Sequence, residues 1–150
     1  MRIEYFCFVV AALAALGGMG LGLYMGLAHD FTLAPAHAHL NLLGWVTMCL
    51  YGLYHRGRKT ASTALSWLQV GAGTAGFAGM SGGIAGLMTV GGPVMLTVAL
   101  TGASLALVSM LLFLVMVIGD SRSGRNAATR PALAGEGAAF AGEAPYGPYY

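Results

Sequence analysis

Hydrophobic residues form long runs in this chain, and short polar stretches separate them. No Asp, Glu, Lys or Arg lies within residues 5–28, 31–54 or 60–119. A bilayer hydrocarbon core about 30 Å thick is crossed by roughly 20 apolar residues in helical form. The first two runs therefore predict one crossing each, and the last run is long enough for two. We expect transmembrane helices at residues 5–27, 36–54, 62–90 and 94–118.

The boundary between the last two predicted helices is Gly91-Gly92-Pro93. Glycine permits a tight turn, and proline fits the first turn of a helix but not its interior. The expected fold class is therefore all-α, a polytopic membrane protein whose residues 1–118 form a four-transmembrane-helix bundle. Residues 119–150 are rich in Ala, Gly, Pro and Arg without a clear apolar period, so we expect a disordered cytoplasmic tail there.

Composition agrees with a membrane location. Hydrophobic residues make up 57% of the chain and charged residues only 8%, whereas soluble domains carry about 25% charged residues. The net charge is +2 and no basic stripe is present, so no nucleic-acid partner is expected. The expected partner is the lipid bilayer.

The positions of the basic residues predict the orientation. All seven Lys and Arg residues lie at Arg2, within residues 56–59 or in the C-terminal tail. Residues 28–35 and 91–93, which form the other two loops, contain none. Cytoplasmic loops carry the excess of Lys and Arg. We therefore expect both termini in the cytoplasm of a bacterium, with the helices in its inner membrane.

Glycines recur on one side of two predicted helices. They are Gly18, Gly22 and Gly26 in the first helix, and Gly76, Gly79, Gly83 and Gly86 in the third. Helices in lipid associate through close backbone approach, which small residues permit. The two stripes therefore predict tight helix packing, and they also offer a face for a homodimer.

Histidine is the residue type most suited to chemistry in this chain. His29, His37 and His39 cluster with Asp30 at the predicted exterior end, and ionisable residues near the membrane often mark functional sites. His55 lies sixteen residues beyond His39, or about 24 Å along a helix, so it belongs to the cytoplasmic end. Beside Arg56, it is expected to be an interfacial polar cap.

His37 and His39 should point to different sides of their helix, about 200° apart. His37 continues into a small and polar stripe formed by Asn41, Gly44, Met48 and Gly52. His39 continues into an apolar stripe formed by Leu43, Val46, Leu50 and Leu53. Periodicity therefore favours His37 as the residue that faces the bundle, and His39 as one that faces lipid or a partner subunit.

One sequence motif resembles a known family. The motif is His37-Ala38-His39-Leu40-Asn41-Leu42-Leu43-Gly44-Trp45, followed by Tyr51-Gly52-Leu53-Tyr54. It resembles a histidine-bearing helix of heme-copper oxidase catalytic subunits, especially the nitric oxide reductase and cbb-type branch. It is also similar to small stand-alone membrane proteins described as oxidase-subunit-I-like.

The resemblance implies a b-type heme. In that family the motif supplies an axial ligand of the low-spin heme, and the residue that matches is His39. The iron would be bound by His39 or His37, and the other axial position would go to His29, a methionine or a histidine of a second copy. Asn41 and Trp45 would lie beside the porphyrin. The implied role is electron transfer, or that of an accessory subunit in a respiratory-chain complex.

The same resemblance excludes a complete oxidase. The catalytic subunits have many more spans, and they need further histidines for a second heme and for copper. This chain has four histidines in all, three of them at the relevant end. It therefore cannot build the binuclear centre alone.

Two other functions are compatible with the sequence. His29, Asp30, His37 and His39 could combine with exterior methionines (Met25, Met88 and Met95) to handle copper, because imidazole and thioether ligands suit Cu(I). Alternatively, the chain is a non-enzymatic assembly or structural protein that contains no cofactor.

Overall fold

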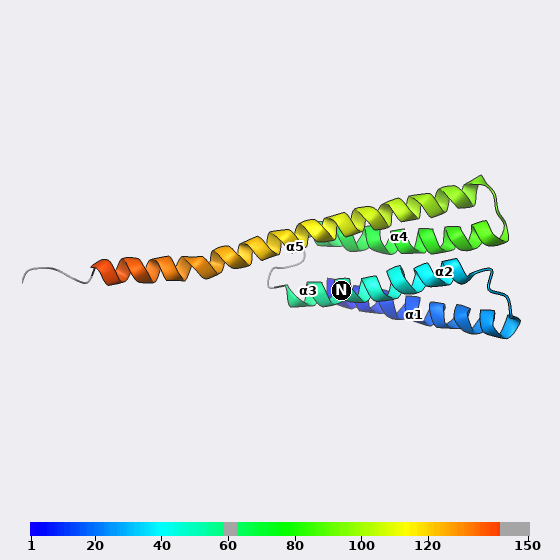
Figure 1. Ribbon diagram of the computed structural model, residues 1–150, viewed down its shortest axis with the longest axis horizontal. Coiled ribbons are helices and arrows are strands. Elements are labelled where there is room, and N and C mark those ends of the chain that lie inside the picture. Colours follow the sequence, from blue (N-terminus) through cyan, green and yellow to red (C-terminus); the bar gives the residue numbers. More distant parts are fainter. Residues whose placement is uncertain (59–62, 142–150) are drawn as a thin grey trace, which may run out of the picture. The chain divides into compact units, whose positions relative to one another are not determined.

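The computed structural model describes residues 1–58 and 63–141, with side chains described up to Ser123. The described residues are helical apart from turns and short connections, which confirms the predicted all-α class. The helices, shown in Figure 1, are α1 (Ile3–Ala28), α2 (Ala34–His39), the π-helix η1 (Leu40–Thr47), α3 (Met48–Gly57), α4 (Ala64–Thr89) and α5 (Pro93–Ala141).

The chain divides into two compact units, Met1–Phe113 and Leu114–Tyr150. The first unit holds α1 to α4 and the first part of α5, and it carries every candidate site residue. The second unit differs from expectation, because α5 continues past Gly119 to Ala141 where a disordered tail was predicted. Alanine, which is frequent in this stretch, has the highest helix propensity. Residues 142–150 lie outside the described residues.

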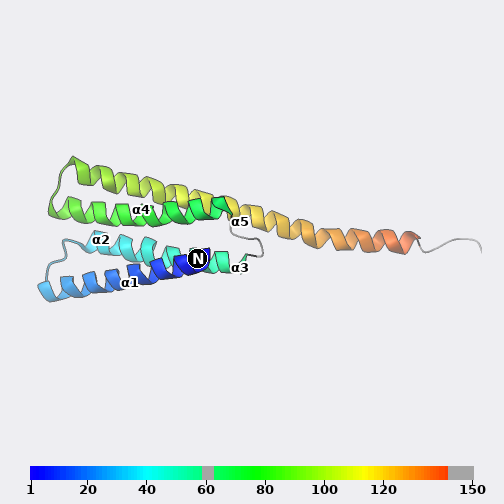
Figure 2. The same ribbon diagram turned by 180° about the vertical axis from the view of Figure 1, so that it is seen from behind.

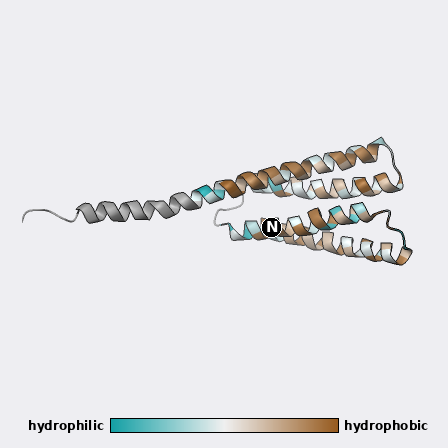
Figure 3. Ribbon diagram, in the orientation of Figure 1, coloured by the Kyte–Doolittle hydropathy of each residue, from teal (hydrophilic) through white to brown (hydrophobic). Residues whose placement is uncertain are grey.

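Within the described part of the chain, two helices are long and apolar enough to cross a membrane, Ile3–Ala28 and the Pro93–Ser123 part of α5. Only 22% and 17% of their most apolar segments are buried, so their hydrophobic side chains point mainly outward, unlike those of a soluble core helix. Figure 3 shows the hydrophobic residues along this part of α5. By this criterion the spans at 36–54 and 62–90 are not confirmed, and the four-span arrangement stays a proposal.

The segment α2–η1–α3 runs antiparallel to α1 and packs against it (Figures 1 and 2). Near one end, Phe8 packs closely on Gly52: a Cβ atom added to this glycine would lie only 2.7 Å from Cε1 of the Phe8 ring. In the middle, one on Gly44 would lie 2.8 Å from Cβ of Ala14 and 2.9 Å from the ring of Phe77. Gly44 is therefore the point where α1, η1 and α4 meet.

The α4 glycine stripe packs closely, as the sequence predicted, and its partner is α5. A Cβ atom on Gly76 would lie 2.9 Å from Cα of Ala106, and one on Gly83 would lie 2.7 Å from Cα of Ala99. On α1, Gly18 and Gly22 contact η1 and α2, whereas nothing lies within 4 Å of the Cβ position of Gly26. Both stripes serve packing within this chain, except at Gly26.

The predicted turn before α5 is confirmed. Gly91 and Gly92 have φ angles of 76° and 91°, and Pro93 begins α5. Side chains other than glycine rarely adopt such φ angles. The sequence of two glycines and a proline therefore ends α4 and starts the return helix.

The π-helix η1 was not predicted. It follows directly after His39 and is continuous with α2 and α3. The hydroxyl of Thr47 donates to the carbonyl of Leu42, five residues earlier, at 2.9 Å. π-helices are rare and often occur at functional sites, so η1 directs attention to the residues around it.

Candidate functional site

His37 faces the interior of the bundle, as its stripe predicted. A Cβ atom on Gly22 of α1 would lie 3.0 Å from Cε1 of the His37 ring. Asn41, one turn further, donates from Nδ2 to the His37 carbonyl at 2.9 Å and lies 3.4 Å from both ring nitrogens. The Asn41 amide rests directly on Gly18. The two glycines therefore make room for two polar side chains between α1 and the α2–η1 segment.

His39 is held differently. Its Nδ1 atom lies 2.7 Å from the carbonyl oxygen of Pro35, one turn earlier in α2. A carbonyl oxygen only accepts hydrogen bonds, so Nδ1 carries the proton. In the neutral ring Nε2 then has the free lone pair. A hydrogen bond from Nδ1 to a backbone carbonyl is typical of histidines that bind a metal through Nε2.

His29 and Asp30 are not gathered with the other two histidines. His29 is the exposed C-cap of α1, with a left-handed φ of 53°. The Asp30 carboxylate accepts hydrogen bonds from the amide of Thr32 at 3.0 Å and from its hydroxyl at 2.6 Å. These bonds lower the pKa of Asp30. Among the described residues no group of three His, Cys, Asp or Glu side chains could hold a metal ion.

The apolar stripe expected below His39 is split by η1. Val46, Leu50 and Leu53 are exposed, as predicted. Leu43 instead turns inward, where it lines a cavity together with Thr47 and Tyr51. The wider turn of a π-helix explains the difference, because residues three apart, such as Leu43 and Val46, no longer lie on the same side. Trp45 is 48% exposed on the outer surface.

A second polar cluster, missed at the sequence level, lies at the other end of the first unit. His55 Nε2 lies 3.1 Å from Oε1 of Gln69, and Gln69 donates from Nε2 to the Ser109 hydroxyl at 3.3 Å. Ser109 in turn lies 3.3 Å from the Tyr51 hydroxyl. The prediction that His55 is an interfacial cap is therefore wrong, because its side chain is only 7% exposed. Gln69, a long polar residue inside a predicted span, was the feature of the sequence that could have indicated this cluster.

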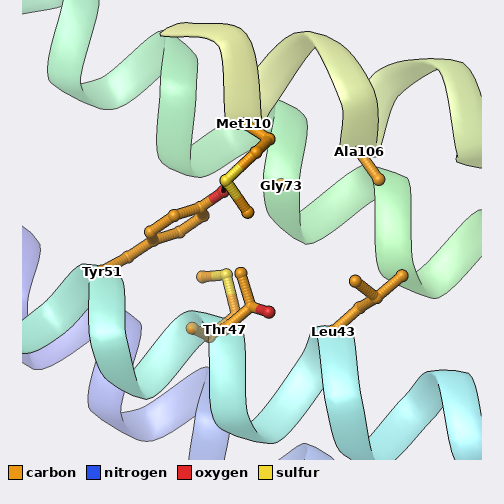
Figure 4. Close-up of a pocket in the computed structure, with 7 residues that line it drawn as sticks. Leu43, Thr47, Tyr51, Gly73, Ala106 and Met110 are labelled. Carbon is orange, nitrogen blue, oxygen red and sulfur yellow. Dashed lines mark hydrogen bonds between the residues drawn. The ribbon is translucent and has the colours of Figure 1, made fainter. Parts of the chain in front are cut away.

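A small cavity adjoins this cluster. It has a volume of about 20 Å³. Figure 4 shows Leu43, Thr47 and Tyr51 on one wall, opposite Met110 and Ala106 on α5. A cavity of roughly 10–15 Å³ on this measure can hold a water molecule. The space fits one water and no larger ligand.

Replacing Ser109 with alanine should destabilise the first unit by about 0.6–2 kcal/mol, because hydrogen bonds between membrane helices contribute about that much. Ser109 is fully buried and bonds to both Gln69 and Tyr51. Ser104, also on α5, is exposed and donates only to the Leu100 carbonyl of its own helix. Ser104→Ala is therefore the matched control and should change stability little. Thermal unfolding in detergent measures the stability of both variants. Equal effects would contradict the idea that the cluster holds α3, α4 and α5 together.

The comparisons with known proteins give no relative. No protein-family model matches the chain, and neither does a curated protein or a solved structure. The function must therefore be inferred from the residues and their geometry.

Proposed function

We propose that the chain is a four-span protein of the bacterial inner membrane, with both termini in the cytoplasm. The contact between Gly52 and Phe8 places Arg56 and Arg58 at the same end of the first unit as Arg2. The loops at the opposite end contain no Lys or Arg. This distribution is what the positive-inside rule requires.

Within this bundle we propose that His39 is an axial ligand of a single b-type heme. The observation that carries the proposal is the contact between His39 Nδ1 and the Pro35 carbonyl at 2.7 Å, which leaves Nε2 available to iron. His37 fits less well, because its ring is packed against Gly22 and Asn41. The order of preference is therefore His39 before His37.

The surroundings of His39 suit an apolar porphyrin. Leu42, Trp45 and Val46 expose apolar surface on η1, and no Asp, Glu, Lys or Arg lies within residues 31–54. A bound heme would supply an iron that carries one electron at a time. The function that follows is that of an electron-transfer or accessory subunit of a respiratory complex.

The second axial ligand would come from His29, a methionine or His39 of a second copy. The ratio of heme to chain separates these sources. One heme per chain supports a ligand from the same chain, and one heme per two chains supports a homodimer.

The first test is the visible spectrum of the protein purified in mild detergent from heme-replete cells. We expect a sharp b-type band after reduction with dithionite. His39→Ala should abolish the band. His37→Ala, two residues away on the same helix, should retain it.

Three results would revise the proposal. A colourless protein would contradict heme binding and favour the assembly or structural role. Copper without heme in a metal analysis would favour the copper-handling alternative. Loss of the band in His37→Ala but not in His39→Ala would reverse the ligand assignment.

A further inference from the structure

The cavity beside the buried polar cluster lies where η1, α3, α4 and α5 meet, and the proposed function does not use it. Most of its lining is apolar, but two of the lining side chains carry hydroxyl groups (Figure 4). The lining residues are Leu43, Thr47, Met48, Tyr51, Gly73, Ala106 and Met110. A purely apolar cavity stays empty of water, whereas a cavity with polar partners can hold it. The two hydroxyl groups therefore decide what the cavity binds.

The Tyr51 hydroxyl is buried and only weakly bonded. The residue is 2% exposed, and its hydroxyl oxygen lies 3.3 Å from Oγ of Ser109 and 4.0 Å from Sδ of Met110. Hydrogen bonds between two oxygens are usually about 2.7–2.8 Å long. The single proton of Ser109 has a shorter acceptor, the backbone carbonyl of Gln69 at 2.8 Å. The Tyr51 hydroxyl can therefore form a further, shorter hydrogen bond on the cavity side.

Thr47 supplies an acceptor on the same cavity. Its hydroxyl donates its one proton to the Leu42 carbonyl at 2.9 Å. A hydroxyl oxygen has two lone pairs, and no described residue donates to this one. Thr47 lines the cavity on the same side as Tyr51 (Figure 4). A molecule that fills this small space contacts both side chains.

We propose that this cavity binds one water molecule between the hydroxyl groups of Tyr51 and Thr47. The Tyr51 hydroxyl donates to the water, and the water donates one proton to Oγ1 of Thr47. The ligand class is a small neutral molecule, because the lining contains no charged side chain and the cavity volume is about 20 Å³. The water extends the hydrogen-bonded cluster of His55, Gln69, Ser109 and Tyr51 from the cytoplasmic end toward the middle of the bundle.

NMR spectroscopy of the full chain in detergent tests whether water is present. We expect a cross-peak between the water resonance and the methyl group of Ala106, which lines the cavity. Ala99, also on α5, is the control, because it is buried against Gly83 outside the cavity; its methyl group should show none. A dry apolar cavity would instead admit xenon. Methyl shifts of Ala106 and Met110 under xenon without a water cross-peak would overturn the proposal.

Thr47→Val tests the binding groups, because it replaces the hydroxyl with a methyl group of similar size. Thr74→Val on α4 is the matched control. The Thr74 hydroxyl also donates to a carbonyl of its own helix, that of Val70 at 2.9 Å, but Thr74 does not line the cavity. We expect Thr47→Val to abolish the Ala106 cross-peak and to lower the Tm by about 2–4 °C more than Thr74→Val does. Equal Tm changes, or a cross-peak that survives in Thr47→Val, would overturn the site.

Discussion

Replacing Gly102 with alanine should be among the most damaging single substitutions in this chain, with a loss of about 1–3 kcal/mol or more in the free energy of unfolding. A Cβ atom at this position would meet the backbone of α4. It would touch the amide nitrogen of Met80, and it would lie 2.6 Å from the carbonyl carbon of Gly79 and 2.8 Å from the carbonyl oxygen of Gly76.

Backbone atoms cannot move aside as a flexible side chain can. The methyl group would therefore push α5 away from α4 along the whole glycine stripe. Dispersion between closely packed backbones is a principal attraction between helices in lipid, and it falls steeply with separation. The added methyl thus weakens contacts beyond its own position.

Gly82→Ala is the matched control. Gly82 lies on α4, and nothing is within 4 Å of its Cβ position. Alanine there should be neutral or should stabilise the helix by up to about 1 kcal/mol, because glycine has a low helix propensity. Unfolding of both variants in the same detergent measures the difference. Similar effects at the two positions would show that α4 and α5 do not pack through their glycines.

The boundaries of the fold were predictable because they depend on local chemistry. Gly91-Gly92-Pro93 permits one structure, a turn followed by a helix start, and it is confirmed. The α4 stripe was also predictable, because glycines three and four apart necessarily share one side of a helix. Both features could be predicted without knowing which helix packs against them.

The arrangement around η1 was not predictable in the same way. Apart from Asn41 and Thr47, residues 40–47 are apolar or small, and their spacing suits a regular α-helix as well as a π-helix. Within the π-helix Gly44 meets both Ala14 and Phe77, and such contacts between helices cannot be deduced from spacing along one helix. Consequently the inward turn of Leu43, Thr47 and Tyr51 could not be predicted from periodicity.

In the candidate site, one feature was predictable from the sequence and another was not. The prediction that His37 faces inward is confirmed, because its stripe of Asn41 and Gly44 is small and polar enough to mark the bundle side. The partner of His39 was not predictable, since the contact with Pro35 depends on ring orientation rather than on spacing. Its assignment as the heme ligand remains a proposal that rests on the motif together with this contact.

Deleting Leu53 should have an even larger effect than Gly102→Ala, because it would change the register of α3. In this regular α-helix one residue corresponds to about 100° of rotation. Then Tyr51 before the deletion, which bonds to Ser109, or His55 after it, which bonds to Gln69, must leave its present contact.

The expected cost of the deletion is at least the roughly 2–5 kcal/mol lost when one large core side chain is removed. Leu53→Ala is the control, because this side chain is 53% exposed and the substitution leaves the register unchanged; it should stay within about 0.5 kcal/mol of the original chain. Unfolding in detergent distinguishes the two variants. If the deletion were as mild as the substitution, the packing of the bundle would not depend on the register of α3.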